Sequence, residues 1–360
     1  MRKVGLGIVG CGFISEIYLK NIRSMFETLE LVGVCDLFYE KAEGVAAEYR
    51  CKAYATYDSL VRDEKIELVL NLTRPSEHFA VCMAALGAGK HVYTEKPLGA
   101  TLDEGRRIMA EAKKRGLTVG CAPDTVLGAG LQTARRLIDS GEIGQPLNAS
   151  AFLMLPGHEL WHPSPEFYYQ PGGGPLMDMG PYYVTALVQL LGAAESVTGM
   201  ARASFPTRTI QSGPKAGVVF PVNAETHVGA LIRFRSGAMA NLLMSFDTQA
   251  AQLPHIEVYG SEGTLSAPDP NTFGGPVTVC PAGSKAFVVK PLLFPFPENS
   301  RGLGLSDQAD AILTGRAPRA EGALGLHILE ILCGILSSAA SGASVRIESN
   351  PERPEPMRAL

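Results

Sequence analysis

The sequence has little of what recruits polyanions, structural metals or disulfides. Its 360 residues carry a formal net charge of -4, which gives no reason to expect a nucleic-acid partner. The seven cysteines are scattered without a C-x-x-C pair, so reduced, buried thiols are expected rather than a disulfide framework or a zinc site. No apolar signal segment precedes the first strand pattern. We therefore expect a cytoplasmic protein with no nucleic-acid or membrane partner and no bound metal.

Long uninterrupted apolar runs are scarce as well. The most apolar late stretch, residues 322–340, contains His327 and Glu330, which favours a core helix over a membrane span. Hydrophobic residues still make up 46% of the chain and charged residues 19%, a composition that supports large cores rather than disorder. The length predicts two domains rather than one.

Glycine, by contrast, is concentrated near the N-terminus. The motif G-x-G-x-x-G, typical of dinucleotide-binding turns, fits the stretch "VGLGIVGCGFIS" in two frames, Gly5–Gly7–Gly10 and, with serine in third place, Gly10–Gly12–Ser15. The first frame leaves too short a strand and places Gly12 in the first helical turn, where it weakens the helix. The second frame leaves a strand over residues 3–9 and an amphipathic helix over residues 13–26. We therefore favour the second frame.

In that frame the backbone, not side chains, would hold a diphosphate. Gly10 makes the tight turn, and Gly12 lets the backbone approach the phosphates. The helix begins at Phe13 and Ile14, so its first N–H groups and its positive end would face the anion. These four residues are expected to bind the cofactor.

An acidic residue ends the second predicted strand, "LELVGVCD". The Asp36 carboxylate can accept hydrogen bonds from both adenosine ribose hydroxyls, and it would repel a 2′-phosphate. No arginine follows it in residues 37–39 to bind such a phosphate. NAD is therefore favoured, while Lys41 keeps NADP open.

Alternating strand and helix patterns continue through residues 1–122 and predict a doubly wound parallel sheet. In such sheets ligands bind at the carboxyl ends of the strands. Polar residues at or just beyond these ends are therefore expected to contact the cofactor, and they are Thr73, Arg74, Pro75, His78, Glu95 and Lys96. The Lys96–Pro97 bond is a candidate cis peptide.

Residues 123–345 predict an α+β domain with a large, mostly antiparallel open sheet and helices on one face, and residues 346–360 an exposed tail. Residues 276–300 are proline-rich and are expected to form a loop. The uncovered face of such a sheet predicts a subunit contact.

Aromatic and histidine residues are concentrated in "PGHELWHPSPEFYYQPGGG". Stacking and hydrogen-bonding groups for a sugar-like ligand are expected from His158, Trp161, His162 and Tyr168, although loop packing or a subunit contact would explain them equally well. The two histidines lie four apart, but no third metal ligand is suitably spaced. Asp124 is a candidate acceptor for a substrate hydroxyl.

The stretch "GGGPLMDMGPYYVTALVQLLG" carries a second polar set. If Pro175 opens a helix, Asp178 and Tyr182 lie four residues apart on one face. Pro181 allows another interpretation, in which it begins the helix and leaves Asp178 in the approach loop. Because Tyr183 is adjacent, a core role for Tyr182 also stays open.

Four segments, "GIVGCGFIS", "NLTRPSEHF", "AGKHVYTEKPLG" and "GGGPLMDMGPYY", resemble the signatures of the Gfo/Idh/MocA oxidoreductases. The resemblance implies a Rossmann domain followed by an α+β domain, nicotinamide-dependent activity on a CH–OH group, and a catalytic role for Lys96 in the E-K-P tripeptide. It also implies a homodimer or homotetramer. Most members have histidine where this chain has Tyr182; the glucose–fructose oxidoreductase and dimeric dihydrodiol dehydrogenase branches have tyrosine.

These residues predict one reaction. Tyr182 would exchange a proton with the substrate oxygen, the Lys96 ammonium would lower the phenol's pKa, and Asp178 would orient both. The expected activity is hydride transfer between NAD(P) and a secondary alcohol or ketone of a sugar, polyol or related cyclic compound. An NAD-retaining lyase or glycosidase and a non-catalytic NAD-binding sensor stay open as alternatives.

Overall fold

The computed structural model describes residues 2–360, which divide into two compact units. Unit 1 contains the residues up to Leu127 together with Asn299–Leu329 and Pro354–Pro356. Unit 2 contains Gly128–Glu298, Glu330–Arg353 and Met357–Leu360. Residues 299–329, which the sequence analysis assigned to the second domain, therefore group with the first.

Unit 1 is built on a parallel six-stranded sheet with the strand order β3-β2-β1-β4-β5-β6. Its strands are β1 (Val4–Val9), β2 (Leu29–Cys35), β3 (Lys52–Tyr54), β4 (Leu68–Asn71), β5 (His91–Thr94) and β6 (Val119–Cys121). Strands β1 and β4 are buried along their whole length, as in sheets covered by helices on both faces. The strand order reverses between β1 and β4, and this is where such sheets bind ligands.

The helices of unit 1 follow the predicted alternation. They are α1 (Phe13–Met25), α2 (Tyr39–Tyr49), α3 (Tyr57–Val61), α4 (Pro75–Gly87), α5 (Leu102–Arg115), α9 (Leu303–Thr314) and the first residues of α10 (Gly322–Ser341). Local chemistry explains their ends: the Thr101 side chain accepts the Glu104 N–H at 3.2 Å to begin α5, and Gly116 ends it with a φ of 67°.

The glycine frame predicted from the sequence is confirmed, since β1 ends at Val9 and α1 begins at Phe13. Gly10 has a φ of 100°, and a Cβ there would lie 2.7 Å from the carbonyl oxygen of Leu72. Gly5 lies inside β1, where a Cβ would overlap the carbonyl oxygen of Lys65. Glycine at position 5 therefore serves sheet packing, and glycine at position 10 serves the turn.

Unit 2 is built on a nine-stranded sheet with the order β16-β15-β14-β13-β7-β12-β11-β8-β17. Its strands are β7 (Pro146–Met154), β8 (Ala194–Arg202), β11 (His227–Phe234), β12 (Met239–Ser245), β13 (Ile256–Gly260), β14 (Gly263–Ala267), β15 (Val277–Pro281), β16 (Val288–Lys290) and β17 (Val345–Arg346). All neighbouring strands are antiparallel except β7 and β12. A separate pair is formed by β9 (Thr207–Thr209) and β10 (Val219–Pro221).

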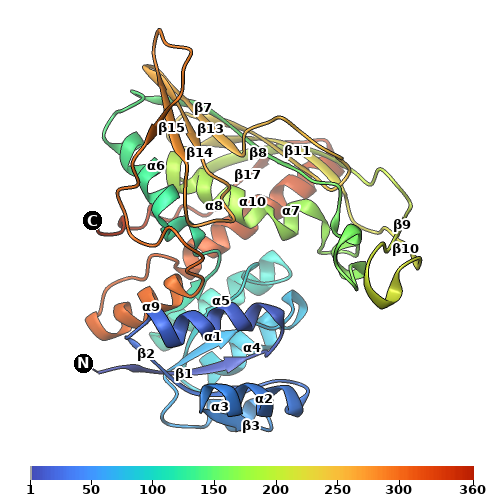
Figure 1. Cartoon of the computed structure of the whole chain (residues 1–360), viewed down its shortest axis with the longest axis vertical. Helices are drawn as coiled ribbons and strands as arrows, with labels where there is room; N and C mark the ends of the chain where they lie inside the picture. The colour runs from blue at the N-terminus through green and yellow to red at the C-terminus, as the bar shows by residue number, and fades with distance from the viewer. Residues whose placement is uncertain (1) are drawn as a thin grey trace. The chain divides into compact units, whose positions relative to one another are not determined.

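Helices cover one face of this sheet (Figure 1). Helix α6 (Ala129–Asp139) packs on β14 and β15, α7 (Gly174–Asp178) on β11 and β12, and α8 (Gly180–Leu191) on β7. The later part of α10 packs on β8, where a Cβ on Gly199 would lie 2.6 Å from the carbonyl oxygen of Ile335. The predicted fold class, a doubly wound Rossmann sheet plus an α+β domain with a mostly antiparallel sheet, is confirmed.

The expectation of a loop over residues 276–300 is wrong in part, because β15 and β16 lie within it. Val277 and Val279 are buried while Thr278 between them is not, so a strand periodicity was present among the prolines. The segment after β17 is exposed over much of its length, yet it is not a loose tail: Arg353 pairs with Asp139, and the Met357 N–H donates to Gln132 at 2.8 Å.

Helix α10 is long and apolar enough to cross a membrane, and 56% of its most apolar window is buried. A single helix of this kind is weak evidence for a membrane span, because core helices share its composition. Its Glu330 is only 6% exposed and accepts N–H groups from Glu348 and Ser349 at 3.1 and 3.0 Å. Burial of a carboxylate among such partners fits the predicted core helix.

Asp124 is buried, with 2% of its surface exposed, and it contacts the start of α9. One carboxylate oxygen, Oδ2, accepts the N–H groups of Gly302 and Gly304 at 2.8 and 3.0 Å. Burial raises the pKa of this carboxyl to about 6, although the two N–H groups oppose the shift. The carboxylate is thus committed to α9, which corrects the expectation that Asp124 receives a substrate hydroxyl.

Asp124→Asn tests this structural role. The folded state binds a proton at Asp124 more readily than the unfolded chain, so the wild type loses about 2 kcal/mol of stability at this residue between pH 4.5 and pH 7. The asparagine oxygen can accept both N–H groups without a charge, so the variant should lack this loss in urea unfolding measured at both pH values. Asp103→Asn, on the exposed face of α5, is the control. If the free energy of unfolding of Asp124→Asn depends on pH as it does in the wild type, the structural role assigned to Asp124 is contradicted.

Candidate functional site

Asp36, the acid predicted to bind the adenosine ribose, is hydrogen-bonded to the glycine turn. Asp36 follows β2, and its Oδ2 accepts the Cys11 N–H at 2.7 Å while its Oδ1 accepts the Phe38 N–H at 2.9 Å. Both bonds use backbone donors, so the carboxylate is held in position without a countercharge. The side chain predicted to select the nucleotide therefore lies beside the turn predicted to hold its phosphates.

The turn itself is shaped for a diphosphate. Gly12 caps α1 without offering a side chain to the first N–H groups, which belong to Phe13 and Ile14. A Cβ on Gly12 would meet nothing within 4 Å, so the space beside the turn at this residue is open. Ser15 is buried, and its hydroxyl donates to the Gly12 carbonyl at 2.6 Å, which explains why a small residue stands in third place. The residues present thus fit a dinucleotide.

His78 joins the loops after β4 and β5. Its Nδ1 lies 2.7 Å from the Pro97 carbonyl oxygen and its Nε2 lies 3.1 Å from that of Thr73. A neutral imidazole carries one N–H and satisfies one carbonyl, whereas the imidazolium satisfies both. Burial lowers the pKa of His78, and the two carbonyls oppose this. Because the ring is 0% exposed, His78 positions the two loops, and the expectation of direct cofactor contact is corrected.

The predicted residues that precede His78 lie between the end of β4 and the first turn of α4. Pro75 is the first residue of α4, and the exposed Arg74 is its N-cap. The Thr73 hydroxyl donates to Asn71 Oδ1 at 2.6 Å. Asn71 is fully buried at the end of β4 and was not singled out from the sequence, although a buried-strand pattern ending in asparagine is a usable signal.

The loop that carries Lys96 is fixed through Glu95. One oxygen of Glu95 accepts the Lys96 N–H at 3.1 Å, and the other accepts the Tyr18 hydroxyl at 2.8 Å. The Lys96–Pro97 peptide is cis, as the sequence predicted. Tyr18 comes from the buried face of α1 and was missed, because the helix pattern marked it only as a core aromatic. The Lys96 N–H is thus held by Glu95, which Tyr18 in turn holds in place.

Asp178 and Tyr182 lie on two short helices rather than one. Pro175 stands in the first turn of α7, which ends at Asp178, and Pro181 stands in the first turn of α8. Tyr183 is fully buried, and its hydroxyl lies 3.0 Å from His255 Nδ1. Tyr183 therefore lies in the core, and Tyr182, in the first turn of α8, is also buried at 8% exposure.

The aromatic loop, residues 156–173, brings its predicted residues together. His158 Nε2 lies 2.9 Å from Asp178 Oδ2, and the His158 ring centroid lies 4.3 Å from that of Tyr168 and 5.3 Å from that of Trp161. His162 contacts the Trp161 ring at 5.3 Å. Burial lowers the pKa of His162, which fits its Nδ1 accepting the Ser164 N–H at 3.0 Å. In residues 2–360 no group of three or more His, Cys, Asp or Glu is arranged to hold a metal ion.

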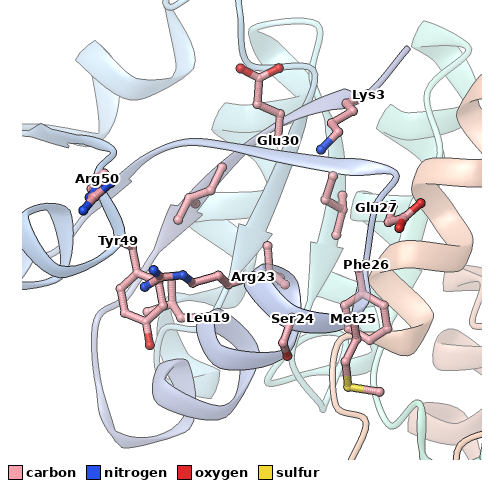
Figure 2. Close-up of a pocket in the computed structure, with 13 residues that line it drawn as sticks. Lys3, Leu19, Arg23, Ser24, Met25, Phe26, Glu27, Glu30, Tyr49 and Arg50 are labelled. Carbon is pink, nitrogen blue, oxygen red and sulfur yellow. The ribbon is translucent and has the colours of Figure 1, made fainter. Parts of the chain in front are cut away.

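Unit 1 also has a cavity of about 480 Å³, at the amino ends of its strands (Figure 2). It is lined by the start of β2 and the ends of α1 and α2, and it contains Lys3, Arg23 and Arg50 together with Glu27 and Glu30. Cations at helix C-termini complement the helix dipoles, which accounts for the two arginines. Because it lies at the amino ends of the strands, this cavity is not the dinucleotide site.

Comparison with known proteins agrees with this arrangement. Residues 4–122 match the family model described as "Oxidoreductase family, NAD-binding Rossmann fold", and residues 131–266 match the "GFO/IDH/MocA C-terminal domain". Inositol 2-dehydrogenase of Salmonella typhimurium is 34% identical over 39% of this chain and 43% of its own length, so the chain spans less than half of that relative. The 1,5-anhydro-D-fructose reductase of Ensifer adhaerens is 28% identical over 95% of this chain and 98% of its own.

Solved structures agree on the fold. The aldose-aldose oxidoreductase of Caulobacter crescentus, complexed with glycerol, superimposes with a TM-score of 0.78 and 24% identity over 96% of this chain and 100% of its own. The glycine turn, the E-K-P loop and both matched domains lead to one conclusion: this chain belongs to the Gfo/Idh/MocA family of oxidoreductases, whose first domain is an NAD-binding Rossmann fold.

Proposed function

We propose that the protein transfers hydride between a nicotinamide cofactor and a secondary alcohol or ketone of a sugar, polyol or related cyclic compound. The observation that carries the proposal is the held E-K-P loop: the Lys96 backbone is fixed through Glu95, Tyr18 and His78 in a chain of this family. A lysine on a plain surface turn would not need a loop held by the buried Tyr18 and His78 and the partly buried Glu95. The relatives' names, inositol dehydrogenase and anhydrofructose reductase, support the substrate class.

Each part of the cofactor would meet a different element of unit 1. The backbone N–H groups of Phe13 and Ile14 would bind the diphosphate above Gly10 and Gly12, and Asp36 would bind the adenosine ribose. When bound, NAD supplies the hydride acceptor at its nicotinamide ring. The residues beyond the carboxyl ends of β4 and β5 would line that half, namely Thr73, Arg74, Pro75, Glu95 and Lys96.

The proton would be handled by Tyr182, Lys96 and Asp178. A phenol has a pKa of about 10, so it is a weak base at neutral pH unless a cation favours the phenolate. The Lys96 ammonium would supply that cation and hydrogen-bond the substrate oxygen. Asp178, already bonded to His158, would orient the group. The reaction requires Lys96 and Tyr182 to act on one substrate oxygen.

The aromatic loop would bind the substrate. Trp161 is 59% exposed and offers a flat face, while His158, His162 and Tyr168 carry polar atoms at the edges of their rings. A sugar ring has apolar C–H faces and a polar rim, so stacking combined with peripheral hydrogen bonds suits it.

We also propose that the protein forms a homodimer or homotetramer through the outer face of the nine-stranded sheet. Apolar side chains from β8, β11 and β12 are exposed there: Met200 is 82%, Leu231 58% and Met239 48% exposed. Light scattering should give a multiple of the 38.3 kDa chain mass, and Leu231→Asp should lower it. A wild-type protein with the mass of one chain would contradict the proposal.

Tyr182→Phe tests the mechanism, with its neighbour as a matched control. Loss of the phenol should lower kcat at least about tenfold, while the dissociation constant for NAD stays the same. Tyr183→Phe should keep its turnover, because the Tyr183 side chain is buried in the core and its hydroxyl contacts His255. NADH formation is measured with a panel of inositols, aldoses and anhydrosugars. A fully active Tyr182→Phe would refute the role of Tyr182, and product release without NADH would favour the NAD-retaining lyase.

Asp36→Ser tests the nucleotide preference. Because the carboxylate repels a 2′-phosphate, the wild type should prefer NAD, and the variant should shift the kcat/KM ratio toward NADP at least about tenfold. Lys41 lies near this position, 5.1 Å from the Phe38 ring centroid, and would then be the cation closest to the added phosphate. A wild-type preference for NADP would contradict the proposed role of Asp36 in binding the ribose and repelling a 2′-phosphate.

A further inference from the structure

A buried ion cluster lies beneath the aromatic loop, and the proposed reaction does not use it. Arg208 in β9 donates to Glu159 Oε1 at 2.8 Å, to the Phe246 carbonyl at 3.3 Å and to the Asp247 carboxylate. The side chains of Arg208, Glu159 and Asp247 are only 12%, 4% and 7% exposed. Ions so poorly hydrated are stable only while their partners stay in place.

The cluster has one end fixed to the sheet. Asp247 follows β12, its N–H donates to Ser245 Oγ at 3.0 Å, and its second oxygen accepts the Thr226 hydroxyl at 2.7 Å. Glu159, the other acid, lies in the aromatic loop. Arg208 is therefore the bridge between a rigid sheet end and the loop.

From Glu159 the contacts lead to the proposed catalytic group. The second carboxylate oxygen of Glu159 accepts a hydrogen bond from the Tyr169 hydroxyl. The Tyr169 oxygen in turn accepts one from the backbone N–H of His158, at 3.2 Å. His158 Nε2 then lies 2.9 Å from Asp178 Oδ2. One continuous set of polar contacts therefore joins Arg208 to Asp178.

The loop backbone is built around this set. Gly157 has a φ of 100°, and a Cβ there would lie 2.4 Å from Glu159 Oε2 and 2.6 Å from the Tyr169 hydroxyl. The segment that carries Arg208 also bonds the loop directly, since the Gln211 N–H donates to the Glu159 carbonyl at 2.8 Å. The path of the loop thus depends on keeping Glu159 and Tyr169 together.

We propose that Arg208 is a positioning residue, which holds the aromatic loop in the conformation where His158 meets Asp178 and thereby sets the affinity for the substrate. Without it, two buried carboxylates lose the cation between them, and the loop, as the movable end, opens to water. The effect on substrate affinity rests on the proposed function, whereas the effect on the loop does not.

The experiment uses Trp161, the only tryptophan of the chain, which lies in this loop. In Arg208→Met, acrylamide quenching of Trp161 fluorescence should rise by about half, because the indole loses its contacts with His158 and His162. The KM for the sugar should rise about tenfold or more and by a larger factor than kcat falls, while the NAD dissociation constant changes less than about threefold. Arg208→Lys keeps the charge but not the planar guanidinium group. Its quenching and its KM should therefore lie between those of the wild type and those of Arg208→Met.

Lys215→Met is the matched control. Lys215 pairs with Glu166 at 2.7 Å and joins the same two segments, but both side chains are partly exposed, so its loss should change neither quenching nor KM. If Arg208→Met does not fold, Glu159→Gln removes the charge from the other side and should change quenching and KM in the same direction.

The outcomes separate the two proposals. A folded Arg208→Met or Glu159→Gln with wild-type quenching and wild-type KM overturns the positioning role. A wild type without turnover on any polyol or sugar overturns the proposed function instead, and the quenching comparison still decides the role of Arg208.

Discussion

The cofactor half of the molecule depends on one close approach between backbones. The turn after β1 passes so near the end of β4 that a Cβ at position 10 would lie 2.7 Å from a carbonyl oxygen, and the turn adopts a φ of 100° to do so. Only glycine tolerates both conditions. Because the turn is held there, α1 begins at Phe13 without a side-chain cap, and the Cys11 N–H can reach Asp36. The proposed recognition of phosphate and of ribose would both depend on this contact.

The groups proposed to do chemistry are held by polar residues that do none themselves. In unit 1, Tyr18 and Glu95 fix the Lys96 backbone, and His78 joins two loop carbonyls across neighbouring strands. In unit 2, Arg208 and Glu159 act in the same way on the loop that carries His158. These supports are buried or partly buried, where hydrogen bonds to charged groups are costly to break, so each loop has one favoured position.

Much of the fold followed from the sequence, because its signals are local. Apolar periodicity located the Rossmann strands, and the choice between the two glycine frames needed only strand length and helix propensity. The pieces that failed depend on distant partners. From the sequence alone Asp124 is a candidate ligand-binding acid, because the N–H donors of Gly302 and Gly304 are far away in the chain. Strands β15 and β16 were missed because prolines surround their short alternating pattern. Arg208 is one arginine among many until the fold places two acids beside it.

The exchange of histidine for tyrosine at position 182 has a chemical consequence for the direction of the proposed reaction. At neutral pH a phenol is protonated, so it can give its proton to the alkoxide formed when a ketone is reduced without any prior ionisation. Oxidation of an alcohol needs the phenolate, and therefore needs a cation such as the Lys96 ammonium to stabilise it. A histidine, with a pKa of about 6.5, serves both directions with less help. The tyrosine thus makes alcohol oxidation more dependent on the lysine than ketone reduction, and the strongly held E-K-P loop is where that dependence would be met.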